Sequence, residues 1–355
     1  MKRRKLAILG SSSSVHVRRW AHECLNRNWD VSVISADAED VEGTNCYKIS
    51  PINRNIDWIF KFREVSKLLD SLSPDIVQAH YVSNYGLVTS TYKKAPVVLT
   101  AWGSDILISA KKSFLHRAAA RWALSNASYI TADSNLLIAE IDRLAPKVAS
   151  EMITWGVDLA RFHPASWATK RGFHVVSSRN WEPLYQIDVI IRALARVKMA
   201  RPEAMVVLHL LGKGTQEAVL RQMVQDLNLT DSVIFDGFLN DSGMALVMNN
   251  AKLSISIPTS DSTSVALLES MACGLAVIAS DLPANREWLD PSVLVPLNSP
   301  DALAEKWIAF LDGDLDAETH GRHNSAKIIE KANRQQQMDK VNDIYEQLML
   351  KWKRS

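Results

Sequence analysis

The sequence has few cysteines and no long hydrophobic run. Three cysteines stand far apart in the 355 residues, at Cys24, Cys46 and Cys273. Their odd number and wide spacing exclude a disulfide framework and a zinc-binding pattern, which favours a reducing compartment. No stretch approaches the roughly 18 consecutive apolar residues of a membrane-spanning helix. The basic start MKRRK precedes an apolar run of only Leu6 to Leu9. Because this run is too short for a signal peptide, we expect a cytoplasmic protein.

The chain also lacks an overall excess of charge. It contains 41 Lys and Arg against 39 Asp and Glu, a net charge of +2, which argues against nucleic acid as a partner. The segment 106–125 is an exception, since it has no acidic residue and four basic ones, Lys111, Lys112, Arg117 and Arg121.

A helical projection of 106–125 gathers the large apolar residues on one side, namely Leu107, Phe114, Leu115 and Trp122. A helix that packs this side on the core, with its charges in solvent, explains the pattern. The alternative is a helix that lies on an anionic membrane surface, which would place the protein at the inner face of the membrane.

A third absence concerns the loop after the first expected strand. The dinucleotide fingerprint G-x-G-x-x-G is missing there, because Gly10 is the only glycine before four serines at 11–14. An NAD-dependent oxidoreductase is therefore disfavoured. The backbone and hydroxyl groups of this loop still offer hydrogen bonds to a ligand, and an ordinary surface turn is the alternative interpretation.

Short apolar runs and helical patterns alternate in both halves of the chain. Such runs stand at 5–10, 30–35, 76–79, 97–100, 174–178, 205–211 and 253–258. This alternation, in a chain long enough for two domains, predicts an α/β protein of two doubly wound, Rossmann-like domains. We expect them at residues 1–160 and 161–333, followed by a C-terminal helix at 334–355.

Polar or aromatic residues follow several expected strands of the first half. His80 comes after one strand, and Trp102 and Asp105 come after the next. In open parallel sheets ligands bind at the carboxyl ends of the strands, so these side chains are candidates for one ligand-binding crevice. A structural role is the alternative for His80, because a lone histidine at a strand end is often part of the packing.

The most informative stretch is 253–288, where the pattern predicts a buried strand, a polar loop, a helix over 265–272 and a second strand. The loop and the first helical residue supply Ser262, Thr263, Ser264 and Val265. Free backbone N–H groups and the helix dipole suit this position to a phosphate. Asp261 and Glu269 add two carboxylates with seven residues between them. Amides for a diphosphate and carboxylates for sugar hydroxyls indicate a sugar nucleotide as ligand.

The segment from Asp261 through ESMACGLAVIASD to ANREW resembles the signature of family 4 of the retaining nucleotide-sugar glycosyltransferases, which have the GT-B fold. Four further segments are similar to the family and occur in the expected order: ITWGVDLARFHP, VVSSRNWEPLYQIDVIIRAL, LLGKGTQEAVL and VIFDGFL. The resemblance covers nearly the whole chain. It implies two Rossmann-like domains facing across a cleft, the acceptor bound mainly to the first and the donor mainly to the second. It also implies a final helix that crosses back to the first domain.

The resemblance implies roles for individual residues. Arg179 and the helix start at Thr263 would stabilise the leaving diphosphate. Glu269 would hold the ribose, and Asp261 would hold hydroxyls of the donor sugar. The remaining donor-binding candidates are Ser262, Ser264, Val265, Gly212, Lys213, Tyr185, Phe238 and Gly10. No metal or cofactor is expected, because the nucleotide sugar is a co-substrate and the family works without a metal.

The donor half departs from the family pattern at three places. The first acid is Asp261, which has a shorter reach than the usual Glu, and serine and threonine at 262–264 replace a glycine-rich turn. Tyr185 stands where a lysine is usual, which removes one cation from the diphosphate. Lys213 is the candidate to compensate for it.

The acceptor half departs at Trp102, which stands where the family often has a histidine near the reacting sugar. A tryptophan cannot do the polar work of a histidine. His80 or His16 would then stand in, or no side chain is needed there.

These features predict a metal-independent retaining glycosyltransferase, in which Asp261, Glu269, Arg179 and His80 are the catalytic candidates. It would transfer a sugar from a UDP-sugar, or less favourably a GDP-sugar, to a hydroxyl of a glycan or lipid-linked acceptor. Synthesis of a cell-surface polysaccharide or lipopolysaccharide is the expected setting. The departures at Tyr185 and Trp102 leave a non-catalytic sugar-nucleotide-binding partner as an alternative. A nucleotide-sugar epimerase on the same fold is another.

Overall fold

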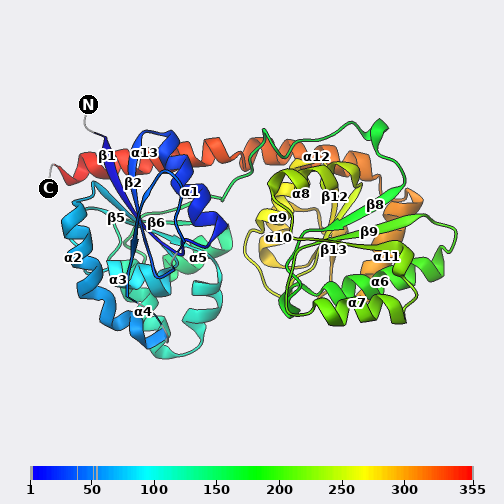
Figure 1. Cartoon of the computed structure of the whole chain (residues 1–355), viewed down its shortest axis with the longest axis horizontal. Coiled ribbons are helices and arrows are strands. Elements are labelled where there is room, and N and C mark those ends of the chain that lie inside the picture. The colour runs from blue at the N-terminus through cyan, green and yellow to red at the C-terminus, as the bar shows by residue number, and fades with distance from the viewer. Residues whose placement is uncertain (1–2, 38, 51, 53–54, 354–355) are drawn as a thin grey trace. The chain divides into compact units, whose positions relative to one another are not determined.

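The structure, a computed structural model, describes residues 3–37, 39–50, 52 and 55–353. The chain folds into two compact units (Figure 1). One comprises the residues up to Trp155 together with those from Gln335 onward, and the other runs from Gly156 to Arg334. The sequence had suggested boundaries after residues 160 and 333, close to these positions.

The first unit is built on a seven-stranded sheet in the order β3-β2-β1-β4-β5-β6-β7, with parallel pairing throughout. The strands are β1 (Arg4–Leu9), β2 (Trp29–Ser35), β3 (Asn45–Lys48), β4 (Ile76–His80), β5 (Val97–Ala101), β6 (Tyr129–Ala132) and β7 (Ser150–Met152). Along β1, Ala7 and Leu9 pack into one core cluster, whereas Leu6 and Ile8 pack into another. Both faces of the sheet are therefore buried, which explains why its strands read as short continuous apolar runs.

Helices cover both faces of this sheet. One face carries α2 (Phe62–Leu72), α3 (Leu87–Thr89), α4 (Phe114–Ser125) and α5 (Asn135–Leu144). The other carries α1 (Val15–Asn26) and the C-terminal α13 (Arg334–Trp352). The Trp20 indole donates a hydrogen bond to the Tyr345 hydroxyl at 3.1 Å, and Tyr345 donates to Gln78 at 2.7 Å. This chain of bonds ties α13 to α1 and to β4.

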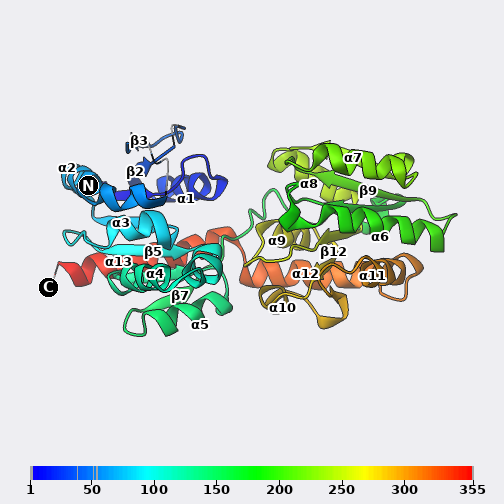
Figure 2. The same ribbon diagram turned by 90° about the horizontal axis from the view of Figure 1, so that it is seen from below.

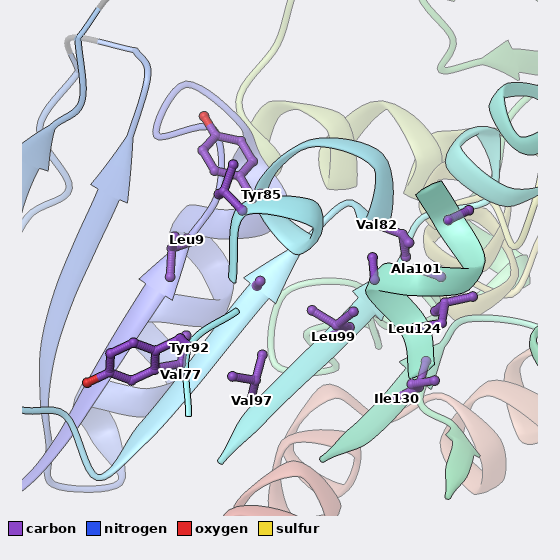
Figure 3. Close-up of a cluster of buried hydrophobic side chains, with 14 of the residues drawn as sticks. Leu9, Val77, Val82, Tyr85, Tyr92, Val97, Leu99, Ala101, Leu124 and Ile130 are labelled. Carbon is purple, nitrogen blue, oxygen red and sulfur yellow. The ribbon is translucent and has the colours of Figure 1, made fainter. Parts of the chain in front are cut away.

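Figure 3 shows part of the core between the sheet and α2 to α5. Leu9, Val77, Leu99 and Ile130 come from four neighbouring strands, and Leu124 comes from α4. Each of these side chains is at most 1% exposed. Burial of such an aliphatic side chain stabilises the folded state by about 1.5–3 kcal/mol, so this layer fixes the positions of the strand ends.

The second unit repeats the same arrangement. Its six-stranded parallel sheet has the order β10-β9-β8-β11-β12-β13, which is the doubly wound order of Rossmann folds. The strands are β8 (Phe173–Ser177), β9 (Val206–Leu211), β10 (Val233–Gly237), β11 (Leu253–Ser256), β12 (Ala276–Ser280) and β13 (Leu294–Val295). The predicted architecture of two doubly wound α/β domains is thus confirmed.

The helices of the second unit are α6 (Ile187–Ala200), α7 (Glu217–Asp226), α8 (Asp241–Asn250), α9 (Val265–Ala272), α10 (Pro283–Trp288), α11 (Pro300–Asp312) and α12 (Ala317–Lys331). Helix α6 packs beside α11, and α9 packs beside α12 (Figure 2). The helix predicted over 265–272 has the observed bounds of α9. Within the described ranges, no helix combines the length and the apolar character needed to cross a membrane.

The helix predicted over 106–125 begins later than expected. The chain first forms a π turn at Ser104–Ile108 and a 3₁₀ turn at Ser109–Lys111. Helix α4 starts only at Phe114, because the Ser113 side chain caps its first turn by accepting a hydrogen bond from the His116 N–H.

The side of α4 that was expected to pack on the core is exposed. Phe114 and Leu115 are 82% and 76% exposed, whereas Ala120, Ala123 and Leu124 are buried. Small alanines let the helix backbone approach the layer beneath it closely. Phe114 and Leu115 therefore lie outside the core while Leu124 packs within it, so the expectation that the side of Phe114 and Leu115 faces the core is wrong.

Candidate functional site

The predicted donor residues of the second unit follow the carboxyl ends of four adjacent strands. Arg179 follows β8, Gly212 follows β9, Phe238 follows β10, and Asp261 follows β11. Because these strands are neighbours in the order β10-β9-β8-β11, their loops meet at one edge of the sheet. This is the edge at which open α/β sheets bind ligands.

Arg179 is the centre of this group. Its guanidinium forms an ion pair with the Asp261 carboxylate at 2.7 Å and donates a hydrogen bond to the Ser264 hydroxyl. The guanidinium also lies over the Tyr185 ring, 4.3 Å from its centroid. The side chain is only 9% exposed. A charged, buried guanidinium held from three sides is preorganised, and its planar fork of donors matches phosphate oxygens.

Two other acidic residues of the second unit, Asp236 and Glu182, have different partners. Asp236 pairs with His209 at 3.0 Å. Glu182 accepts hydrogen bonds from the backbone and the hydroxyl of Thr215, at 2.8 Å and 2.5 Å. The structure thus brings Arg179 to the residues of the acidic motif.

Helix α9 presents its amino end to the same place. Ser264 is its N-cap and accepts a hydrogen bond from the Leu267 N–H at 3.3 Å. Ser262, Thr263 and Ser264 are each at most 6% exposed. The Trp288 indole donates a hydrogen bond to the Thr263 hydroxyl at 3.3 Å. Trp288 ends the ANREW segment but was not among the predicted site residues.

The loop after β9 supplies the second cation. The Lys213 ammonium lies 5.2 Å from the centroid of the Phe238 ring, and its backbone carbonyl accepts a hydrogen bond from the Trp181 N–H at 3.0 Å. Gly212 has φ +146°, and a Cβ at that position would collide with the Arg179 carbonyl oxygen. Glycine is therefore required for the close approach of this loop to the Arg179 backbone.

Glu269 lies on the second turn of α9 and is 3% exposed. Most glutamates on helices face solvent, but Glu269 is buried among small and apolar residues. Buried carboxylates are uncommon unless they have partners. Glu269 lies on the same helix whose N-cap, Ser264, accepts a hydrogen bond from Arg179.

The acceptor-side candidates form a separate cluster in the first unit, which we call the aromatic cluster: His16, Trp20, His80, Trp102 and Trp155. The His16 ring lies 4.6 Å from Trp155 and 5.5 Å from Trp102 between centroids. The His80 ring lies 5.0 Å from Trp20 and 6.0 Å from Trp102. The sequence pointed to three of these rings, but Trp20 and Trp155 had not been assigned to the site.

His80 is fully buried within the aromatic cluster. Burial, with a smaller contribution from His16, lowers the pKa of His80 to about 3. Both of its ring nitrogens lack a hydrogen-bond partner among the described residues. The side chain is therefore a neutral imidazole at physiological pH and cannot serve as a general acid there.

Asp105 is also fully buried, and its carboxylate accepts hydrogen bonds from backbone N–H groups. The donors are Val82 at 2.8 Å, Gly103 at 3.0 Å, and Trp102 and Ile106 at 3.1 Å. Burial raises its pKa, against the effect of these bonds. Asp105 thus joins the loops after β4 and β5 and holds the Trp102 backbone in place.

Gly10 is used for packing. Its N–H donates to the Ile34 carbonyl at 3.2 Å, and a Cβ there would press on Val17 at 2.8 Å. The serines that follow are engaged with Asp37, which accepts hydrogen bonds from Ser11 and, at 3.0 Å, from Ser13. The loop is therefore held by contacts inside the first unit.

No group of three or more His, Cys, Asp and Glu side chains suited to a metal ion occurs in the described part of the chain. The chemistry that the residues themselves offer is anion binding by Arg179, Lys213 and the start of α9. Asp261, which pairs with Arg179, and Glu269, which lies on α9, are carboxylates suited to hydroxyl recognition.

Comparison with known proteins agrees with this arrangement. Residues 5–134 match the family model "Glycosyl transferase 4-like", and residues 162–335 match "Glycosyl transferases group 1". The chain belongs to the glycosyltransferases that combine these two domains, and it has the GT-B fold.

The curated relatives include synthases and sugar transferases. N-acetyl-alpha-D-glucosaminyl L-malate synthase of Bacillus anthracis is 22% identical over 77% of this chain and 73% of its own length. Phosphatidyl-myo-inositol mannosyltransferase of Mycobacterium tuberculosis (strain H37Rv) is 35% identical over 38% of this chain and 36% of its own length. The second match thus covers only about a third of each protein.

Two solved structures share the fold over nearly the whole chain. Sucrose-phosphate synthase from Thermosynechococcus elongatus has a TM-score of 0.83 at 17% identity, covering 98% of this chain and all of that chain. Anabaena HepE, solved in complex with UDP, has a TM-score of 0.80 at 15% identity, covering 97% of this chain and all of that one.

Proposed function

We propose that this glycosyltransferase is a retaining, metal-independent enzyme that uses a UDP-sugar as donor. The observation that carries the proposal is the setting of Arg179. Its guanidinium is bound to Asp261 and Ser264, stacked on Tyr185, and placed at the capped start of α9. A preorganised cation beside free helix N–H groups is suited to the charge of a departing diphosphate.

In the proposed reaction the bond between the anomeric carbon and the diphosphate oxygen breaks, and a bond to an acceptor hydroxyl oxygen forms on the same face. The acceptor proton passes to the departing phosphate oxygen. Arg179 and the N–H groups at Ser264 and Val265 stabilise the negative charge that builds on the diphosphate. No protein nucleophile is needed in this reaction.

The two carboxylates bind the neutral parts of the donor. Glu269 accepts hydrogen bonds from the ribose hydroxyls, and Asp261 accepts them from the sugar. A guanidinium has five N–H donors, so Arg179 can keep its bond to Asp261 while it binds phosphate. Lys213 supplies the charge that the lysine replaced by Tyr185 would otherwise bring.

The nucleotide and the acceptor are proposed from the relatives. UDP is favoured because Anabaena HepE was solved with UDP. A glycan or lipid-linked acceptor is favoured by the name of the mycobacterial phosphatidyl-myo-inositol mannosyltransferases. We propose a role in cell-surface glycan synthesis at the cytoplasmic side of the membrane.

An assay of nucleotide release tests the proposal. The protein is incubated with a panel of UDP- and GDP-sugars, with and without glycan and lipid-linked acceptors. We expect acceptor-dependent UDP release that falls at least about 100-fold in Arg179→Ala, the size of the loss when a transition-state donor is removed. Glu269→Ala should lose mainly donor affinity. Arg192→Ala, an exposed ion-pair residue of α6, is the matched control and should keep its activity.

The same assay separates the alternatives. Release that survives both Arg179→Ala and Glu269→Ala would refute the assignment of these residues. Donor binding without release over the whole acceptor panel would favour a non-catalytic binding partner. Conversion of one UDP-sugar into its epimer without release would favour an epimerase. The anomeric configuration of the product, determined by NMR, must match that of the donor.

A further inference from the structure

The first unit carries exposed large apolar side chains next to a group of cations. Phe114 and Leu115 at the start of α4 are 82% and 76% exposed, and Trp122, two turns later, is 40% exposed. Ile108, in the π turn before the helix, is 46% exposed. Large apolar side chains gathered on one segment in this way are uncommon on a surface that faces only water.

This apolar surface continues onto a neighbouring segment. The Phe62 ring at the start of α2 packs 5.9 Å from the Trp122 ring. Phe60, two residues earlier, is 75% exposed. Figure 1 shows the start of α2 and helix α4 at the same end of the first unit. We call this combined area, made of Phe60, Ile108, Phe114, Leu115 and Trp122, the α4 surface.

Four cations accompany the α4 surface. Lys111, Lys112, Arg117 and Arg121 are exposed, and residues 106–125 contain no acidic side chain. Within the described ranges none of the four forms an ion pair with a carboxylate. By contrast, Arg192, Arg196, Arg201, Arg221 and Arg286 of the second unit all do. The positive charge of the four cations near the α4 surface is therefore available to an external anion.

We propose that the α4 surface is a docking site for a membrane that contains anionic lipids. Phe114 and Leu115 enter the boundary between headgroups and acyl chains, as the apolar face of an interfacial helix does. The flanking cations pair with lipid phosphates and add electrostatic attraction to the anionic surface. Cations next to protruding apolar side chains fit this partner better than a protein, whose interface core is depleted of Lys.

The docking site builds on the proposed lipid-linked acceptor, but it does not depend on turnover. It would restrict the enzyme to the surface on which such an acceptor lies. The donor residues belong to the second unit, so changes on the α4 surface should leave UDP binding intact. Membrane binding and donor binding can therefore be measured separately.

Co-sedimentation with vesicles tests the proposal. The full chain should sediment with vesicles of equal parts phosphatidylcholine and phosphatidylglycerol and remain largely in solution with phosphatidylcholine alone. The variant K111S/K112S/R117S/R121S should partition on the order of 1000-fold more weakly. The variant F114S/L115S should partition at least about tenfold more weakly. The matched control M199S/M205S replaces two methionines of the second unit that are each 83% exposed, and it should behave as the wild type.

Three outcomes would overturn the proposal. One is the absence of sedimentation with the anionic vesicles. Another is binding that F114S/L115S and the charge variant leave unchanged. A dimer in sedimentation velocity that F114S/L115S dissociates would instead assign the surface to a second copy of the chain. Thermal unfolding and UDP binding of each variant show that it is folded. Loss of turnover with intact vesicle binding would contradict the proposed function and leave the docking site standing.

Discussion

At the scale of single residues, Tyr185 shows how a substitution in the family pattern is accommodated. It stands where the family usually has a lysine, and its ring lies under the Arg179 guanidinium. The site thus loses a cation but gains a support for the cation that remains. Because a stacked guanidinium loses less freedom when it binds phosphate, the expected role of Tyr185 is to position Arg179.

This role predicts a graded response at position 185. Tyr185→Phe keeps the ring and should leave UDP affinity within about twofold of the wild type. Tyr185→Ala removes a cation–π contact of about 0.5–2 kcal/mol, so the dissociation constant should rise about 2- to 30-fold. Isothermal titration calorimetry with UDP measures both. Equal affinities for the Phe and Ala variants would show that the ring does not position Arg179.

The burial of His80 should make the free energy of unfolding depend on pH. Its pKa is about 3 in the folded protein, against about 6.5 in an unfolded chain. Between these values the unfolded chain binds a proton that the folded protein does not. His80 therefore causes no loss of stability above pH 6.5, and the loss grows by up to about 1.4 kcal/mol per pH unit as the pH falls from 6.5 towards 3.

Replacement of His80 by leucine, which is similar in size, should remove this acid-side loss. As the pH falls from 6.5 to 5, the free energy of unfolding measured by urea titration should increasingly exceed the wild-type value in His80→Leu. The exposed His22 of α1 provides the control His22→Gln, which should show no such widening. A constant difference between His80→Leu and the wild type over this range would contradict the assignment.

At the scale of elements, α9 and α4 show what the sequence could predict. The bounds of α9 were predictable because a local signal marks its start, the Ser264 N-cap, and Gly274 follows its end. The contacts of Arg179 with Asp261 and Ser264 were not, because they join residues about 80 positions apart in the chain. Only the order of the strands brings these residues together.

Helix α4 was predicted with the wrong side buried. A stripe of large apolar residues indicates that one side of a helix is apolar. It does not indicate whether the protein core or another partner covers that side. Ala120 and Ala123 carry little hydrophobic signal, yet they lie on the packed side because they allow close approach. The cap at Ser113 was visible in the sequence but was not used to start the helix.

Ser264 combines two roles at the start of α9, which predicts a double effect of its removal. Ser264→Ala loses the N-cap and should destabilise the protein by about 1 kcal/mol. It also loses the hydrogen bond from Arg179, so UDP should bind more weakly. Ser299→Ala, which removes the cap of α11, should lower stability by a similar amount without weakening UDP binding. Chemical denaturation and calorimetry on the two variants test this, and unchanged UDP affinity in Ser264→Ala would contradict it.

At the scale of the whole molecule, the chain passes between its two units twice, after Trp155 and after Arg334. The segments next to these passages are hydrogen-bonded inside the second unit. Val157 N–H donates to the Ala332 carbonyl at 2.7 Å, and Arg334 N–H donates to the Val157 carbonyl at 3.0 Å. The sequence indicated a domain boundary near each passage but could not show that the two passages pair.

Gly156 is the residue that this pairing requires. It has φ +68°, and a Cβ there would collide with the Arg334 backbone. Gly156→Ala should therefore lower the free energy of unfolding by clearly more than the ~1–2 kcal/mol that an alanine in the left-handed region costs by itself. Gly313→Ala is the matched control, because φ is +87° and a Cβ at that position would meet no other atom within 4 Å. In urea denaturation, Gly156→Ala should lose more free energy of unfolding than Gly313→Ala. Equal losses would show that the Arg334 contact is unimportant.

The central claim is that the loops after β8, β9 and β11 form the donor diphosphate site. A crystal structure of the chain bound to UDP tests it most directly. We expect the diphosphate to lie against the Arg179 guanidinium and the N–H groups at the start of α9, with the ribose hydroxyls on Glu269. A UDP molecule bound with its diphosphate away from Arg179, or a ribose that does not contact Glu269, would contradict it.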